Sequence, residues 1–225
     1  GLPLAVFNPN AEIIYRCSSE RRLCELINSS DISLPDGVGV VWAARLLGSP
    51  LPERIPGIEL GEAVLGRCAV EGIGVFLLGG RPKVAETAAR RLAMRFPGLK
   101  VLGTHHGYFD MSGPDNQEIV RQIAELKPGV VVVCLGFPRQ EEWIISNRAA
   151  LPGVRVMMAL GGSLDVWSGR VRRAPGLFRS AGLEWLWRVT TRPTRLFRTA
   201  FLLAFACRTL REKKRIQSAR EHPFL

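Results

Sequence analysis

Apolar residues cluster along the chain in short runs separated by amphipathic stretches, a pattern that predicts strands alternating with helices. The runs are continuous enough for strands buried on both faces, and they are residues 1–7, Ile73–Leu78, Gly129–Leu135 and Val154–Leu160. Apolar residues recur at helical spacing in Pro82–Phe96 and Asn116–Leu126. This order of elements predicts an α/β fold, a Rossmann-like parallel sheet with helices on both faces.

Three of the predicted strands end in glycine, at Gly79-Gly80, Gly136 and Gly161-Gly162. In open α/β sheets, ligands bind beyond the carboxyl ends of the strands, and glycine followed by a helix N-terminus suits a phosphate. The pattern therefore favours a nucleotide site at this edge. Glycine at a strand end is also ordinary turn chemistry, and none of the turns reads GxGxxG or a P-loop motif.

The excess of positive over negative charge is confined to the last quarter of the chain. The sequence carries 31 Lys and Arg against 20 Asp and Glu, a net charge of +11. Residues 1–169 hold 17 basic and 17 acidic residues, whereas residues 170–225 hold 14 and 3. We therefore predict a neutral core domain over 1–169 and a basic helical appendage over 170–225. The appendage would meet an anionic partner, either a membrane surface or nucleic acid.

The appendage combines basic and aromatic residues at near-helical spacing. Its predicted membrane-docking residues are Trp185, Arg188, Arg192, Arg195 and Arg198, beside an apolar stripe of Phe197, Ala200, Phe201, Ala204 and Phe205. A basic amphipathic helix with aromatic residues is typical of a segment lying in the membrane interface. The alternative is a solvated basic face whose apolar side packs on the core domain. The longest apolar run, Ala200–Cys207, is far below the roughly 20 residues that span a bilayer.

The cysteine and histidine contents argue against disulfide and metal sites. Five cysteines are scattered without a CxxC pair, and three histidines are present, so reduced thiols in a cytosolic compartment fit best. His105 and His106 are adjacent, and on a strand their side chains would point to opposite faces, with no third ligand nearby. We therefore expect neither a metal nor a cofactor.

The stretch Asn28–Gly48 holds the leading candidate for chemistry. A Pro-Asp-Gly turn precedes a predicted helix over Val40–Leu47, which places Asp36 at a loop tip facing the sheet edge. A carboxylate there can take a proton from an acceptor hydroxyl as a general base. Aspartate is also favoured in turns and at N-caps, so the position has a purely structural interpretation as well.

Polar residues in other loops are candidates for substrate contacts. Asn8 and Asn10 either offer side-chain amides to a sugar or phosphate, or form an Asx turn that caps a helix from Ala11. Arg54 lies in a loop bounded by proline and glycine. Arginine is the natural partner of a diphosphate, although a loop arginine is usually a solvated charge.

Two further candidates follow the glycine turns. Pro138 is expected to open a helix whose first turn contains Gln140 and Glu141, with helix capping and a buried Trp143 as the structural alternative. Asp165 follows Gly161-Gly162 and either caps a helix or contacts a ribose or sugar hydroxyl.

These residues lie in motifs that resemble the bacterial WecG/TagA/CpsF glycosyltransferases. The matching segments are NPNAEI at 8–13, LPDGVGVVWAARLLG at 34–48, ERIPG at 53–57, FLLGG at 76–80, GYF at 107–109, LGFPRQEEW at 135–143, GGSLDVWSGRVRRAP at 161–175 and GLEWLWR at 182–188. Because they cover nearly the whole chain in order, the resemblance is far more specific than any single turn.

The resemblance implies a Rossmann-like fold of the GT-E type, followed by a helical appendage that docks at the membrane and helps complete the active site. Family members transfer a sugar, often N-acetylmannosamine, from a UDP-sugar donor to a polyprenyl-diphosphate-linked acceptor, undecaprenyl-diphosphate-linked N-acetylglucosamine. The anomeric configuration inverts and no metal ion is required. The implied location is cytoplasmic, peripheral at the inner face of the plasma membrane. Relatives usually have one more strand and helix before residue 1, so we expect the chain to start inside a longer sequence.

Motif matching also assigns residue roles by resemblance. The base is Asp36, the diphosphate-binding arginine is Arg54, and the motif glutamine and aspartate are Gln140 and Asp165. The remaining substrate-binding set is Asn8, Asn10, Tyr108, Arg172 and Arg173. The family usually has Thr where this chain has Asn8, and many members have Asp in place of Glu59.

Two other classes of function stay open on the residues alone. A basic nucleic-acid-binding module without catalysis would use the appendage to follow phosphates, although the core domain is neutral and no helix-turn-helix or RNA motif is present. A nicotinamide-dependent oxidoreductase would need the GxGxxG fingerprint that the sequence lacks. The donor sugar is equally open among N-acetylmannosamine, its uronic acid and glucose, as is a homo-oligomer.

Overall fold

The chain forms two compact units in a computed structural model that describes residues 1–180, 182, 184, 186, 187 and 196–221. Unit 1 consists of Gly1–Asn8, Glu25–Ser33 and Gly57–Arg173. Unit 2 consists of Pro9–Cys24, Leu34–Pro56 and Ala174–Leu225. The division predicted at residues 169 and 170 stays a prediction.

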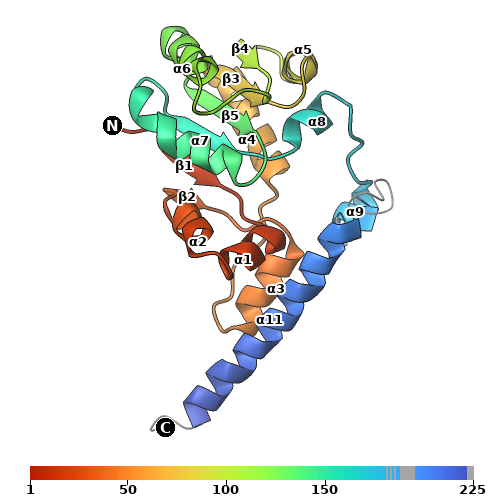
Figure 1. Ribbon diagram of the computed structural model, residues 1–225. Helices are drawn as coiled ribbons and strands as arrows, with labels where there is room; N and C mark the ends of the chain where they lie inside the picture. Colours follow the sequence, from red (N-terminus) through yellow and green to blue (C-terminus); the bar gives the residue numbers. More distant parts are fainter. Residues whose placement is uncertain (181, 183, 185, 188–195, 222–225) are drawn as a thin grey trace. The chain divides into compact units, whose positions relative to one another are not determined.

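Unit 1 is built on a six-stranded, all-parallel sheet in the order β2-β1-β6-β5-β3-β4 (Figure 1). Its strands are β1 (Leu4–Phe7), β2 (Ile32–Ser33), β3 (Gly74–Gly79), β4 (Lys100–His105), β5 (Val130–Cys134) and β6 (Val156–Ala159). This sheet confirms the predicted α/β class. The four apolar runs in the sequence correspond to β1, β3, β5 and β6.

The central strands owe their stability to burial on both faces. All five residues of β5 are buried, as a continuous β-branched run predicts for a covered parallel strand. The register aligns one fully buried residue from each of four neighbouring strands in a single row: Ala5, Met157, Val131 and Phe76. This row forms the middle of the core of unit 1.

The helices of unit 1 lie on both faces of the sheet. They are α4 (Gly57–Glu71), α5 (Val84–Arg95), α6 (Pro114–Leu126), α7 (Arg139–Asn147) and α8 (Ser163–Trp167), with a 3-10 turn, η1 (Arg148–Ala150); α2 (Arg21–Asn28) has residues in both units. The connection from β3 to β4 runs in one direction along the sheet, and that from β5 to β6 in the other. Right-handed crossovers therefore place α5 and α7 on opposite faces.

This reversal of direction creates a topological switch point between β3 and β5. Open α/β sheets bind their ligands in the crevice outside the carboxyl ends of strands at such a point. Strand β3 ends at Gly79 and is followed by Gly80, and Gly136 lies in the turn after β5, as the sequence had marked. The fold thus brings all three predicted glycine turns to neighbouring strand ends, because β6, β5 and β3 lie side by side in the sheet.

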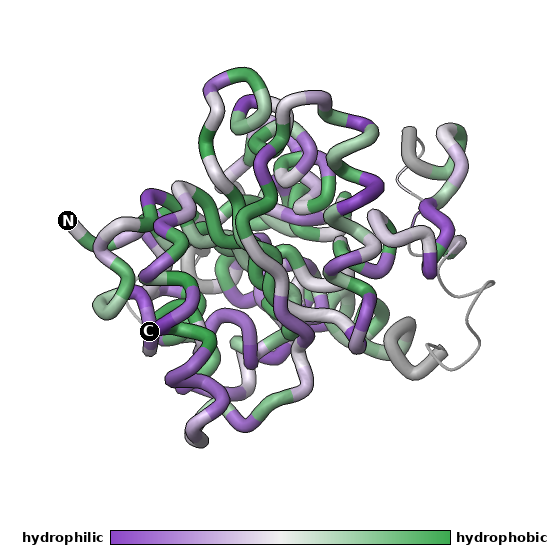
Figure 2. The backbone as a smooth tube through the Cα atoms, turned by 90° about the horizontal axis from the view of Figure 1, so that it is seen from above, coloured by the Kyte–Doolittle hydropathy of each residue, from purple (hydrophilic) through white to green (hydrophobic). Residues whose placement is uncertain are grey.

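Unit 2 contains α1 (Ala11–Cys17), α3 (Val38–Leu46), α9 (Gly176–Ser180) and α11 (Leu196–Glu221). Phe205 of α11 is buried with Ala11 and Ala43, and the Phe201 ring lies 5.9 Å from that of Tyr15. Figure 2 shows hydrophobic and hydrophilic residues interspersed along the backbone. For Phe201 and Phe205, the apolar stripe of the appendage therefore packs on protein within unit 2.

Most of the predicted membrane-docking residues lie outside the part of the chain that the structure describes. Trp185, Arg188, Arg192 and Arg195 lie outside the described residues, and Arg198 belongs to α11 without a described side chain. Within the described part of the chain, no helix has the length and apolar content that a bilayer crossing requires. Membrane docking stays a prediction.

Candidate functional site

The glycine turn after β3 is packed directly against the end of β5. Gly79 has φ +132°, and a Cβ atom there would lie 2.3 Å from the Cys134 carbonyl oxygen. The Gly80 N–H donates to that same oxygen at 3.3 Å, and the Gly107 N–H donates to the Gly80 carbonyl at 2.8 Å. Only glycine meets both the conformational and the steric demand at position 79. The ends of β3 and β5 and the segment after β4 are thereby held together.

Gln140 connects the turns that follow β5 and β6. Its Oε1 accepts hydrogen bonds from the Gly136 N–H at 3.3 Å and the Gly161 N–H at 3.0 Å. Both glycines have positive φ, and a Cβ atom built on either one would meet no atom within 4 Å. The predicted site glutamine therefore lies in the first turn of α7, as expected. Its hydrogen bonds join two glycine turns at the carboxyl edge of the sheet.

Glu141, which follows Gln140, is a buried carboxylic side chain with 1% of its surface exposed. Its Oε1 accepts a hydrogen bond from Gln140 Nε2 at 2.8 Å. Burial raises the pKa of Glu141 to about 7, and the nearby charge of Glu142 also raises it, against the lowering effect of the Gln140 hydrogen bond. At neutral pH a large fraction of this side chain is therefore uncharged.

The other predicted residues of unit 1 occupy distinct surroundings. Asn8 follows β1 directly and is half-buried, whereas Tyr108 is 64% exposed. Asp165 lies in the first turn of α8, whose N-cap is Gly162, so Asp165 does not cap this helix. An ion pair of 3.7 Å joins its Oδ1 to Arg170 Nη1.

The two arginines after α8 differ in their environment. Arg172 is exposed. Arg173 forms an ion pair with Glu59 and a second, at 3.8 Å, with Glu62 on α4. Arg173 thus anchors the segment after α8 to α4, and this anchoring is a structural role that the sequence motif did not indicate.

In unit 2, backbone hydrogen bonds join three motifs that are far apart in the sequence. The Asp36 N–H donates to the Pro9 carbonyl at 3.1 Å, and the Ile55 N–H donates to the Pro35 carbonyl at 2.8 Å. The Asn-Pro-Asn, Pro-Asp-Gly and Arg-Ile-Pro segments are therefore neighbours. The N-cap of α3 is Gly37, so the N-cap interpretation of Asp36 is wrong, and Asp36 lies half-buried in the turn before the helix.

Asn10 and Arg54 both have partners within unit 2. The Asn10 Oδ1 accepts from the Ile13 N–H at 3.1 Å and caps α1, so the capping alternative for this residue is confirmed. Arg54 Nη1 lies 3.9 Å from Glu184 Oε2, and both side chains are largely shielded from solvent. A diphosphate that binds Arg54 would compete with the Glu184 carboxylate.

The histidine pair differs from the expectation of opposite orientations. The ring centroids of His105 and His106 lie 4.4 Å apart, because β4 ends at His105 and His106 is already outside the strand. His105 Nδ1 bonds to the His106 carbonyl at 2.7 Å. Within the described residues, no group of three His, Cys, Asp or Glu side chains has a geometry that could hold a metal ion.

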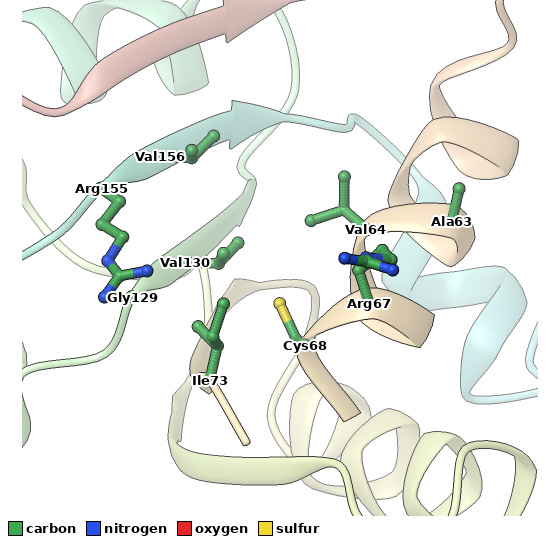
Figure 3. A pocket seen from close by; sticks show the side chains of 9 residues that line it. All are labelled: Ala63, Val64, Arg67, Cys68, Ile73, Gly129, Val130, Arg155 and Val156. Carbon is green, nitrogen blue, oxygen red and sulfur yellow. The ribbon is translucent and has the colours of Figure 1, made fainter. Parts of the chain in front are cut away.

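A cavity of about 320 Å³ lies at the opposite end of the strands in unit 1. Its lining is almost entirely apolar and comes from α4 and from the starts of β5 and β6, including Ala63, Cys68, Val130 and Val156 (Figure 3). The amino ends of parallel strands lie away from the edge where such sheets bind ligands. This cavity is therefore separate from the glycine turns.

The sequence interpretation gave no partner role to several acidic residues that contact predicted site residues, among them Glu62, Glu141 and Glu184. Glu141 follows Gln140 in the same motif, which the sequence shows directly, but the sequence does not show that the Glu141 side chain is buried. Glu184 belongs to the GLEWLWR motif, and its pairing with Arg54 joins residues 130 positions apart. Burial and long-range pairing depend on the fold, so no local pattern could reveal them.

An all-parallel sheet with glycine turns at its carboxyl edge places the chain among Rossmann-like α/β proteins. A sequence model of the Glycosyl transferase WecG/TagA/CpsF family matches residues 2–219, and the chain belongs to this family. It is therefore a glycosyltransferase, as the motif resemblance predicted.

Relatives in Staphylococcus aureus carry a specific name. In strains MRSA252 and NCTC 8325 / PS 47 they are N-acetylglucosaminyldiphosphoundecaprenol N-acetyl-beta-D-mannosaminyltransferases. Each is 36% identical to this chain over 217 residues, which cover 96% of this chain and 84% of the relative.

Proposed function

We propose that this glycosyltransferase moves N-acetylmannosamine from a UDP-sugar to undecaprenyl-diphosphate-linked N-acetylglucosamine, in the synthesis of wall teichoic acid or a related envelope polysaccharide. The observation that carries the proposal is the 36% identity, over 217 residues, with S. aureus enzymes named for that sugar and that acceptor. The aligned region covers 96% of the chain, and so includes residues of both units.

In the proposed reaction Asp36 is the general base. Its carboxylate takes the proton from the acceptor hydroxyl while the oxygen of that hydroxyl bonds to the anomeric carbon of the donor sugar. The bond from that carbon to the UDP oxygen breaks at the same time, and UDP leaves with the bonding electrons. A single displacement of this kind inverts the anomeric configuration. The backbone hydrogen bond to Pro9 supports this role because it holds the Asp36 turn in place.

The leaving diphosphate gains negative charge and needs fixed positive groups near it. Arg54 is the proposed cation, and the reaction is proposed to need no metal ion. Since Glu184 already pairs with Arg54, the diphosphate would have to displace the Glu184 carboxylate, as well as water, from the Arg54 guanidinium. Within unit 1, the glycine turns after β5 and β6 have open space at Gly136 and Gly161 that suits the phosphate groups of a nucleotide.

The lipid-linked acceptor sets the proposed location. Its polyprenyl chain stays in the bilayer, so the enzyme would work at the inner face of the plasma membrane, as a cytoplasmic protein attached peripherally. Basic residues of the appendage would add about 1 kcal/mol each near an anionic leaflet. The described part of α11 ends at Glu221 and includes exposed basic residues such as Arg211.

The test is a radiolabel transfer assay with several UDP-sugars and a short-chain polyprenyl-diphosphate N-acetylglucosamine acceptor. We expect transfer from UDP-N-acetylmannosamine, undiminished by a metal chelator, and about 10²-fold slower transfer in Asp36→Asn. Asp115→Asn, which alters an exposed aspartate on α6, is the matched control and should retain activity. Transfer of a different sugar would correct the donor, and unchanged transfer by Asp36→Asn would remove Asp36 as the base.

A further inference from the structure

Glu141 is a carboxylic acid in the interior of unit 1 with one oxygen lacking a partner. Its side chain is 99% buried, and Oε1 accepts from Gln140 Nε2 at 2.8 Å. The second oxygen, Oε2, is also buried, and no described residue forms a hydrogen bond with it. A buried ionised oxygen without a partner is costly, whereas the neutral acid is tolerated more easily. The site therefore favours the protonated form.

Among the residues that the structure describes, none offers Glu141 a compensating positive charge. Helix α7 packs against β1, β5, β6 and η1. Strands β1 and β6 carry no titratable side chain, and β5 carries Cys134, whose pKa is raised to about 12 by burial. Arg148 of η1 pairs with Asp31 at 2.7 Å, and Arg139 of α7 donates to the Phe109 carbonyl. Glu142 adds a like charge, which disfavours ionisation of Glu141 and raises its pKa.

The orientation of the Gln140 amide depends on Glu141. Gln140 Oε1 accepts from two backbone N–H groups, at Gly136 and Gly161, and its Nε2 donates to Glu141. If the amide were turned over, its NH₂ group would face two donors and its oxygen would face a carboxyl oxygen. The acceptor at Glu141 therefore fixes the amide in the orientation that joins the two glycine turns.

We propose that Glu141 is a positioning residue for donor binding, which acts through Gln140 to hold the β5–α7 and β6–α8 turns in the geometry that receives the diphosphate of a nucleotide sugar. This inference rests on the proposed function, because it concerns the same donor site. Glu141 itself does not touch the donor in this scheme. Its effect reaches the ligand through the position of the two glycine turns, because the Gly136 and Gly161 N–H groups both donate to Gln140 Oε1.

A pH dependence follows from this arrangement. Glu141 carries a proton in the lower part of the neutral range and loses it as pH rises through about 7. The resulting negative charge lies behind turns that are proposed to hold a diphosphate, and like charges repel most strongly where solvent screening is weak. Donor affinity should therefore fall as Glu141 ionises, and donor binding should in turn favour the protonated acid.

Two variants separate the roles of charge and hydrogen bonding. Glu141→Gln is permanently neutral and keeps an acceptor oxygen for Gln140. Glu141→Leu also lacks charge but removes the acceptor and frees the amide. Glu125→Gln, on an exposed glutamate of α6, is the matched control for the same chemical change. The Glu141→Gln comparison stands on its own if Glu141→Leu does not fold.

The experiment measures binding of UDP-N-acetylmannosamine by titration calorimetry from about pH 6 to about pH 8.5. The sugar-linked diphosphate is used because a terminal phosphate has its own pKa of about 6. We expect the dissociation constant to rise about fivefold across this range for the wild type and Glu125→Gln, and less than about twofold for Glu141→Gln. Glu141→Leu should bind the donor about tenfold more weakly than Glu141→Gln at every pH, without a pH trend.

The outcomes distinguish this inference from the function on which it rests. If the wild type binds the donor but Glu141→Gln keeps the full pH trend, Glu141 is not the group responsible and the inference fails alone. Equal affinity of Glu141→Leu and Glu141→Gln for UDP-N-acetylmannosamine would also overturn the inference. If the wild type binds no UDP-sugar at any pH, both the proposed function and this inference fail.

Discussion

Arg54 and Glu184 form an ion pair in unit 2, with 3.9 Å between Nη1 and Oε2. About a quarter of the Arg54 side chain and 16% of the Glu184 side chain remain exposed, so water screens the pair only in part. The contact links the motif that precedes α4 with the GLEWLWR motif. The arginine proposed to bind the diphosphate therefore already has an anionic partner inside the protein.

Replacing Glu184 by glutamine should strengthen donor binding. Without the carboxylate, the diphosphate can bind the Arg54 guanidinium without displacing Glu184. The KM for the UDP-sugar should therefore fall about threefold, which is the size of effect expected for one partly screened charge pair. Steady-state transfer kinetics give the measurement. Glu53→Gln changes an exposed glutamate next to Arg54 and should leave KM as it is. A raised KM in Glu184→Gln would show that Glu184 orients Arg54 for binding instead of competing with the donor.

The turn after β3 should tolerate no side chain at its first glycine. In Gly79→Ala, the new Cβ would lie 2.3 Å from the Cys134 carbonyl oxygen at a backbone φ of +132°, and unfolding in urea should show a loss of about 3 kcal/mol. Gly162→Ala is the control, because Gly162 has φ −86° and open space where a Cβ would lie. A loss below about 1 kcal/mol in Gly79→Ala would mean that the turn can move away from β5.

The buried carboxyl group of Glu141 should make stability depend on pH. Its pKa in the folded protein is about 7 against an ordinary 4.5, so the folded state keeps a proton that the unfolded chain releases. The free energy of unfolding therefore falls as pH rises from about 4.5 to about 7, by about 3 kcal/mol, and stays low at higher pH. Glu141→Gln lacks this loss and should gain stability relative to the wild type over that range. Denaturant unfolding of both proteins at several pH values would reveal a constant difference if Glu141 ionised normally.

Phe205 should be the main apolar contribution of α11 to unit 2. It is 7% exposed and packs with Ala11 and Ala43, so Phe205→Ala should destabilise the protein by about 3 kcal/mol. Leu203→Ala, on the same helix but 70% exposed, should cost less than about 0.5 kcal/mol. Urea unfolding followed by far-UV circular dichroism measures both. Equal effects of the two substitutions would contradict the packing of α11 described for unit 2.

Much of the sheet could be predicted because its central strands carry strong local signals. The run of valines in β5 and the apolar runs of β3 and β6 are buried on both faces, and burial on both faces leaves a continuous apolar segment in the sequence. The edge strand β4, Lys100–His105, has exposed and half-buried residues and no such run, so the pattern did not mark it. The two-residue strand β2 is too short for any periodicity.

The candidate site was predictable only as separate motifs. Asp36, Arg54 and Gln140 could be named from their motifs, and the order of the motifs identified the family. Their surroundings could not be predicted, because the pairing of Arg54 with Glu184 and the burial of Glu141 arise from residues that meet after folding. The docking role of the appendage and the catalytic roles of these side chains stay predictions.

The cavity beside Cys68 gives the two ends of the parallel sheet different tolerance to mutation. At the carboxyl edge, the backbone of β5 leaves no space for a single added carbon on Gly79. At the amino end, Ala63 and Val64 line an apolar space of about 320 Å³ that larger side chains can enter. Side chains at the amino end can therefore be enlarged without a steric clash, whereas the glycine turns cannot change in this way. The fold thereby tolerates substitutions in a place away from the surfaces on which its chemistry is proposed to depend.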